Sequence, residues 1–147
     1  MNYLYLLLTV LVGIALPFQV AMNGQVRDAL GHPLWGAVAN FVVGLLLLLV
    51  LATALRVPLP SNMMLTKPPL WAWCGGLIGV MFVMSAILAG PKIGSAIFFA
   101  LIIAGQLFAS LALDHFGVLG FPHNPLNFWR IIGALMLIGG AVLVVNN

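Results

Sequence analysis

The sequence predicts an all-α integral membrane protein with five transmembrane helices. Of its 147 residues, 64% are hydrophobic and only 5% are charged, whereas a soluble domain carries about 25% charged residues. Five stretches without a charged side chain are each long enough for a helix that crosses the bilayer, which takes about 17–25 residues. The expected helices span about residues 3–22, 34–55, 70–90, 93–113 and 128–146.

The segments between these stretches carry glycines and prolines, which end helices. We expect the first helix to be retained, because its apolar run lacks the positively charged start of a signal peptide. Gly31-His32-Pro33 separates it from the second helix, and the proline-rich segment Pro58–Pro69 separates the second from the third. Gly90-Pro91-Lys92 predicts a tight hairpin between the third and fourth helices, and Gly117–Pro125 precedes the fifth. Polar and apolar residues do not alternate within the runs, so helices are favoured over barrel strands.

Four uncharged polar side chains lie within or at the ends of the expected helices. Gln19 and Asn23 are four residues apart, beside Pro17, and share one face of the first helix. Asn40 and Gln106 belong to the second and fourth helices. In lipid an unsatisfied polar group is costly, so these amides must face protein or water. They either line a substrate cavity or join helices through hydrogen bonds worth about 0.6–2 kcal/mol each; the second interpretation is favoured for Asn23, near the membrane surface.

No expected helix has a charged residue near its centre. Asp114 and His115, at the end of the fourth helix, form a candidate proton relay. The alternative is a solvated helix end, where Arg130 compensates the unfavourable interaction of Asp114 with the helix dipole. The histidines lack a third ligand for a metal, no serine has a paired His and acid, and the single cysteine, Cys74, excludes an internal disulfide. We therefore expect no metal, no cofactor and no enzymatic activity.

Glycines form two stripes of small residues, which let membrane helices approach closely. Gly75 and Gly79 have GxxxG spacing in the third helix, and Gly133, Gly139 and Gly140 lie in the fifth. Each stripe is expected either to pack helices within one chain or to join two chains.

The basic residues give only a weak preference for one orientation in the membrane. Five spans place the termini on opposite faces, and the face of the N-terminus carries three basic residues, Arg56, Lys67 and Arg130. The other face carries two, Arg27 and Lys92. The positive-inside rule places the N-terminus in the cytoplasm by this small margin. Insertion in both directions and one fixed orientation with the N-terminus inside are both compatible with it. The same dispersal argues against nucleic-acid binding.

Three segments together resemble a known family. They are PFQVAMNGQV (Pro17–Val26), PKIGSAIFFALIIAGQLFASLALDHFG (Pro91–Gly117) and FWRIIGALMLIGGAVLV (from Phe128). They resemble short bacterial inner-membrane proteins of the drug/metabolite transporter superfamily, formerly classed as a domain of unknown function. The most specific part is Gly105-Gln106 followed by Asp114-His115-Phe116-Gly117.

The resemblance implies a five-helix unit in the bacterial inner membrane, equivalent to half of a ten-helix transporter. Such proteins occur as single genes, as adjacent pairs of opposite orientation and as fusions. With the buried amides, this predicts a secondary transporter that exports a small organic metabolite or drug by alternating access. The alternatives are an accessory or assembly subunit and a passive channel. Besides the lipid bilayer and the solute, the expected partner is a second copy in an antiparallel homodimer. The competing arrangements are a parallel dimer and a heterodimer with an oppositely oriented paralogue.

Overall fold

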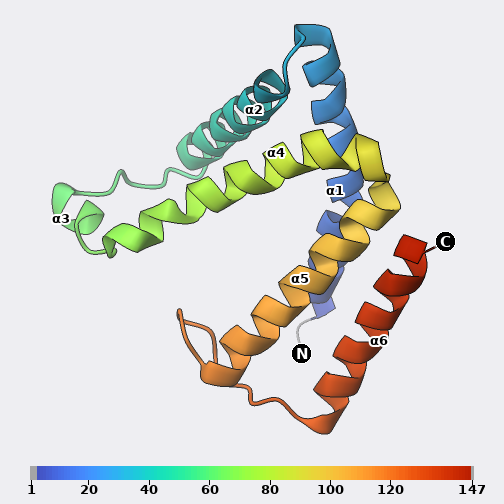
Figure 1. Ribbon diagram of the computed structural model, residues 1–147. Coiled ribbons are helices and arrows are strands. Elements are labelled where there is room, and N and C mark those ends of the chain that lie inside the picture. Colours follow the sequence, from blue (N-terminus) through green and yellow to red (C-terminus); the bar gives the residue numbers. More distant parts are fainter. Residues whose placement is uncertain (1–2, 147) are drawn as a thin grey trace. The chain divides into compact units, whose positions relative to one another are not determined.

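Five helices long and apolar enough to cross a membrane make up most of the computed structural model, which describes residues 3–146 apart from the side chains of residues 62 and 63 (Figure 1). They are α1 (Tyr3–Leu30), α2 (Pro33–Ala54), the continuous stretch Leu70–Ile93 that ends in α4 (Gly75–Ile93), α5 (Ser95–Phe116) and α6 (Phe128–Asn146). A short helix, α3 (Asn62–Leu65), interrupts the proline-rich segment, and a 3-10 helix, η1 (Leu70–Cys74), leads directly into α4. Residues 3–146 contain no strand, so the all-α membrane fold expected from the sequence is confirmed.

The first helix is longer than the sequence predicted, because α1 continues to Leu30 instead of ending near residue 22. Its 28 residues measure about 42 Å along the axis, while the hydrocarbon core of a bilayer is about 30 Å thick. The end of α1, with Arg27 and Asp28, therefore remains helical beyond the apolar layer, and Asp28 does not lie in a loop as expected. Gly31, with a φ of +75°, follows the end of the helix.

The break between α4 and α5 also differs from the expected one at Gly90-Pro91-Lys92. The helix α4 runs through Pro91 to Ile93, and the chain turns at Gly94, whose φ is +88°. Pro91 has no N–H to donate to the carbonyl of Ile87, one turn earlier. Arg27 supplies a donor in its place, since its Nη1 lies 2.8 Å from the Ile87 carbonyl oxygen. The proline is tolerated inside α4 because a neighbouring helix satisfies the freed carbonyl.

The chain forms two compact units, residues 1–91 and 92–147. In the first unit α1 packs against α2, and α4 contributes the fully buried Ile87. Ile87 forms a small core with Val83 and Ala37, which Phe82 and Met84 border. Most other apolar side chains of this unit are exposed, as expected for helices that face lipid or another chain.

The helices α1 and α2 approach most closely at Gly36, which is buried. A Cβ at this position would lie 2.6 Å from the backbone oxygen of Asn23 and 3.1 Å from Cδ1 of Ile87. A side chain therefore does not fit there without movement of the α1 backbone. One turn before Asn23 in α1 and one turn after Gly36 in α2, Gln19 faces Asn40.

In the second unit α5 packs along α6. Phe98 of α5 is buried, as are Ala134 and Ala141 of α6, which are seven residues apart and so share one face. Gly117, with a φ of +59°, ends α5 in the left-handed conformation that glycine adopts readily. The segment that follows returns the chain to the start of α6 at Phe128.

Candidate functional site

Three amide side chains meet between α1 and α2, and we call Gln19, Asn23 and Asn40 the amide cluster. Nε2 of Gln19 donates to Oδ1 of Asn40 at 2.7 Å, and Nδ2 of Asn23 donates to the same oxygen at 3.3 Å. Gln19 and Asn23 project from one face of α1 because they are four residues apart. Asn40 lies one turn beyond Gly36, where α2 touches α1. The structure thus brings together three of the four amides singled out from the sequence.

The amide cluster is partly buried and opens on two grooves. Asn23 is 8% exposed, and Gln19 and Asn40 are half-buried. The larger groove, of about 370 Å³, is lined by Gln19, Asn40, Phe41, Gly44, Leu45 and Leu48. The smaller groove, of about 250 Å³, is lined by all three amides and by apolar residues of both helices. Among the described residues, no charged side chain lines either groove.

The amide cluster has hydrogen-bonding capacity that the described chain does not use. Within residues 3–146, no partner is found for Nδ2 of Asn40, Oε1 of Gln19 or Oδ1 of Asn23. These atoms are not sealed in the interior, because every fully buried side-chain nitrogen or oxygen in the described part has a partner. They therefore keep some exposed surface, and their side chains line the grooves, where a solute or water can bond them.

Gln106 lies near the middle of α5, in the second unit, and its side chain is exposed. None of the described residues hydrogen-bonds its amide. In a bilayer such a group needs a partner from another helix or from water. The expectation that Gln106 shares a cleft with Gln19 and Asn40 stays a prediction.

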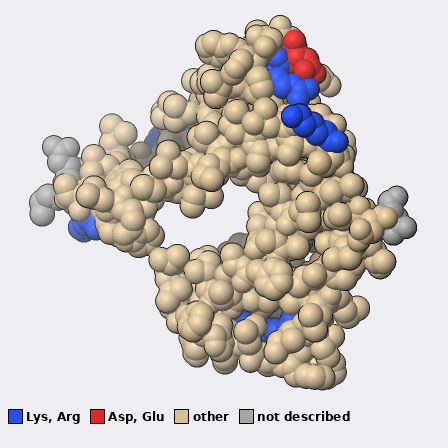
Figure 2. All heavy atoms as spheres, viewed as in Figure 1, with Lys and Arg blue, Asp and Glu red and all other residues tan. Residues whose placement is uncertain are grey.

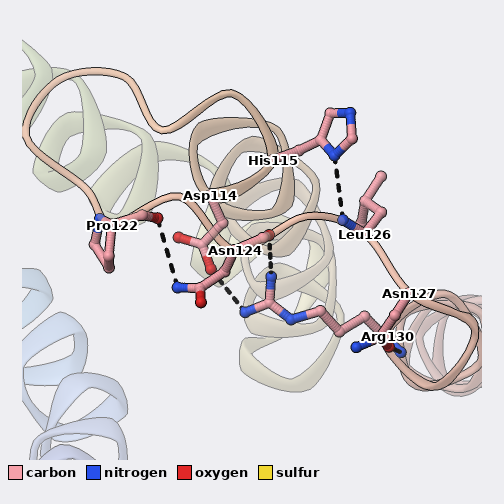
Figure 3. Close-up of polar contacts among 7 residues, drawn as sticks. All are labelled: Asp114, His115, Pro122, Asn124, Leu126, Asn127 and Arg130. Carbon is pink, nitrogen blue, oxygen red and sulfur yellow. Dashed lines mark hydrogen bonds and ion pairs between the residues drawn. The ribbon is translucent and has the colours of Figure 1, made fainter.

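Asp114 forms an ion pair with Arg130, as expected for the compensated helix end (Figure 3). Oδ2 of Asp114 lies 2.8 Å from Nη2 of Arg130, and Nη1 of Arg130 donates to the carbonyl of Asn124 at 2.7 Å. Asn127 caps α6, because its Oδ1 accepts from the backbone N–H of Arg130 at 2.9 Å. This cap was not predicted from the sequence, although an asparagine before an apolar run signals one.

His115 contacts a different part of the same loop. Its Nδ1 accepts a hydrogen bond from the backbone N–H of Leu126 at 3.1 Å, so the proton of the neutral ring is on Nε2 (Figure 3). The ring also lines an apolar groove of about 380 Å³ between α5 and α6. Within the described residues His115 and Asp114 share no hydrogen bond. A proton relay between the two stays a prediction.

The predicted glycine stripes have few neighbours within the chain. At Gly79 an added Cβ would contact the ring of Phe41 at 3.7 Å, so this glycine packs near α2. Nothing lies within 4 Å of that position at the other four, Gly75, Gly133, Gly139 and Gly140. Gly36, which does control a close approach, was missed because it belongs to no paired spacing. The role of the stripes in contacts between chains stays a prediction.

Arg27, Asp28 and His32 lie at helix ends, outside the amide cluster. Charges are few on the face shown in Figure 2 and lie in small, separate groups. Arg27 pairs with Asp28 at 2.8 Å, and Nδ1 of His32 accepts from the backbone N–H of Leu34 at 3.2 Å to cap α2. In the part of the chain that is described, no three His, Cys, Asp or Glu side chains gather as metal ligands.

The model of one protein family matches residues 4–143, which is almost the whole chain. The family is described as "Putative inner membrane exporter, YdcZ". No curated protein and no solved structure matches the chain. The match confirms the resemblance found in the sequence, and the five spanning helices agree with it. The chain is a multi-pass protein of the inner membrane and belongs to the YdcZ family of inner membrane exporters.

Proposed function

We propose that the chain is a secondary transporter that exports a small organic solute, and that the amide cluster is part of its binding site. The observation that carries this proposal is the 2.7 Å hydrogen bond between Gln19 and Asn40. Both residues belong to helices able to span the membrane, and both line the two grooves. Polar groups inside a bilayer are expensive and typically mark a solute pathway.

The unused groups of the amide cluster favour binding over a purely structural role. Two hydrogen bonds are enough to join α1 to α2, and lipid would leave any further donor or acceptor unsatisfied. Asn40 and Gln19 nevertheless keep free groups that are reachable from the grooves. Asn23, which is 8% exposed, suits the joining role that the sequence favoured.

We further propose alternating access in an antiparallel homodimer. Transporters built from inverted repeats bind their substrate between two repeats, and this chain supplies one set of five helices. The three-to-two distribution of basic residues supports insertion in both directions. The exposed amide of Gln106 supports the presence of a partner helix. In this arrangement Gln19, Asn40 and Gln106 of both copies face one cleft; a heterodimer with an oppositely oriented paralogue is the alternative.

Transport by purified protein in proteoliposomes tests the proposal. The solutes to screen are amino acids, sugars, polyamines and aromatic drugs, with and without a pH gradient. Gln19→Leu should reduce the affinity for any transported solute while the protein keeps its elution volume on a sizing column. Thr9→Val is the matched control, because Thr9 is exposed on the same helix and bonds only its own backbone, at the Tyr5 carbonyl. Undiminished transport by a folded Gln19→Leu protein contradicts the assignment of the site.

A further inference from the structure

The chemistry of the amide cluster points to one class of solute, an inference that rests on the function proposed above. We propose that the cluster binds an uncharged planar amide, such as a carboxamide or a lactam, through one donor and one acceptor. The apolar body of this solute occupies the larger groove. Three properties of the site lead to this class: its free hydrogen-bonding groups, its lack of charge and its apolar walls.

The cluster offers a donor and an acceptor at one place. Oδ1 of Asn40 already accepts two N–H groups, at 2.7 and 3.3 Å, which fills its capacity. Nδ2 of Asn40 and Oε1 of Gln19 have no partner among the described residues, and both side chains line the larger groove. A carboxylate has acceptors only and an amidinium has donors only, but an amide carries one of each in the same plane.

This match holds whichever way the amide groups are turned. If all three turn over, Nδ2 of Asn40 donates to Oε1 of Gln19 and to Oδ1 of Asn23, so both hydrogen bonds are kept. The free groups then exchange, and Gln19 presents an N–H while Asn40 presents its oxygen. In both arrangements the larger groove receives a donor and an acceptor, so the cluster accepts a solute amide in either orientation.

A charged solute finds no opposite charge at the cluster. The nearest charged side chain along α1 is Arg27, eight residues or about 12 Å beyond Gln19 along the axis. Its guanidinium is already bonded to Asp28 and to the carbonyl of Ile87, each at 2.8 Å. An unpaired charge in an apolar site is far more costly than an amide whose hydrogen bonds are made. Carboxylates and ammonium ions are therefore disfavoured.

The larger groove has room for the body of such a solute. Its volume of about 370 Å³ falls within the range of small-molecule sites, about 300–1,000 Å³. Beyond the amides its walls are Phe41, Leu45 and Leu48, which suit a ring or a short aliphatic group. Gly44 leaves space in the wall, since nothing lies within 4 Å of an added Cβ there.

Three molecules of nearly the same shape test the class directly: benzamide is neutral, benzoate is an anion and benzamidinium is a cation at pH 7. Their dissociation constants are measured by ligand-observed NMR with the full-length protein in detergent, and binding to empty micelles is subtracted. Benzamide should bind about tenfold more tightly than either ion, because one lost hydrogen bond to a desolvated partner has about that effect. Gln19→Leu should weaken the binding of benzamide by a similar factor, and Thr9→Val should leave its dissociation constant unchanged.

Two further variants separate recognition from folding. Gln19→Glu keeps the length of the side chain and should reverse the preference, so that benzamidinium binds more tightly than benzamide. Gly44→Leu should weaken the binding of benzamide, benzoate and benzamidinium alike, because its side chain fills the larger groove and leaves the amides in place.

The outcomes distinguish this inference from the proposed function. If benzoate or benzamidinium binds as tightly as benzamide, and its binding depends on Gln19, the proposed solute class is wrong. The amide cluster then remains the proposed binding site for transport. Benzamide binding that is unchanged in Gln19→Leu and Gln19→Glu overturns both the class and the site. Absence of benzamide binding overturns the class, and the transport screen then still decides the function.

Discussion

Asn40 receives both hydrogen bonds of the amide cluster, although it lies on a different helix from its two partners. Loss of Asn40 leaves Nε2 of Gln19 and Nδ2 of the buried Asn23 without an acceptor. Loss of Gln19 leaves the bond between Asn23 and Asn40 intact. The three amides are therefore unequal in stability as well as in exposure.

Asn40→Leu should lower the free energy of unfolding more than Gln19→Leu does. The physical reason is the desolvation of the abandoned Asn23 amide, which is 8% exposed, and such a loss is worth about 1–3 kcal/mol. Thermal unfolding of the two variants in the same detergent measures the difference. Equal stability of the two, or a less stable Gln19→Leu protein, would show that Asn40 is not the shared partner of the other two amides.

Residue spacing predicted only part of the site. Gln19 and Asn23 share a face because they are four residues apart on one helix. Asp114 was expected to pair with Arg130 because both charges lie at neighbouring helix ends. The bonds to Asn40 depend on the approach of two helices at Gly36, which no local pattern signals. The bond from Leu126 to His115 likewise depends on the path of a loop, which the sequence does not specify.

The contact between α1 and α2 depends on a missing side chain. Gly36→Ala places a methyl group 2.6 Å from the backbone oxygen of Asn23, and such overpacking typically destabilises by about 1–3 kcal/mol. Gly44→Ala, in the same helix, meets nothing within 4 Å and should be neutral or stabilising by up to about 1 kcal/mol, because alanine favours helix. Melting temperatures in detergent test the pair, and an equally stable Gly36→Ala protein would contradict the close approach.

The link between α1 and α4 depends on the carbonyl that Pro91 leaves without a donor. Arg27→Met removes the replacement donor at 2.8 Å from the Ile87 oxygen and should lower the free energy of unfolding, because the carbonyl loses its hydrogen-bond partner. Pro91→Ala restores a backbone N–H at the right place, so Arg27→Met should be less harmful in that background. A double-mutant cycle compares the effect of Arg27→Met on the free energy of unfolding with Pro91 and with Pro91→Ala. Loss of the Arg27–Asp28 ion pair contributes equally in both cases, so it cancels from the coupling. Additive effects would show that the two residues act independently.

Helix number was predictable, as were the ends of α2 and α6, but the end of α1 and the turn before α5 were not. Apolar length decides how many segments cross a bilayer, and all five were expected. Charge marks the limit of the apolar layer instead of the limit of the helix, so α1 was placed eight residues too short. The turn before α5 was misplaced because Pro91 is accommodated by a contact from another helix, and Gly94 with its φ of +88° makes the turn instead.

Dual insertion of the whole chain is testable with one added cysteine. The natural Cys74 is exposed and must first be removed as Cys74→Ala. A cysteine is then placed after the C-terminus and treated with a membrane-impermeant reagent. Part of the protein should react in intact cells, from outside, and the rest only after permeabilisation, from the cytoplasmic side. The small charge bias is the physical reason, since neither orientation is strongly preferred. Reaction from one side alone excludes the antiparallel homodimer.

The purified protein should not release a proton when a lipophilic cation binds. No acid lies near the centre of the described helices, and the Asp114 carboxylate, at the end of α5, is held by Arg130. Addition of tetraphenylphosphonium in weak buffer near pH 7, followed with a pH electrode, tests this expectation. Proton release would identify exchange of protons for cations, and Asp114→Asn would then show whether Asp114 carries the proton.

The placement of charge at helix ends also has an electrical consequence. Arg27 and Lys92 lie in the last turns of their helices, Arg130 in the first turn of α6, and Asp114 near the end of α5. A membrane potential acts on a charge that moves through its field, with about 2.3 kcal/mol per elementary charge for each 100 mV. Helices that carry charge only at their ends move little of it across the field when they rearrange. A neutral solute would then cross at a rate set by its concentration gradient and indifferent to voltage, so a valinomycin-imposed potential should leave its flux unchanged.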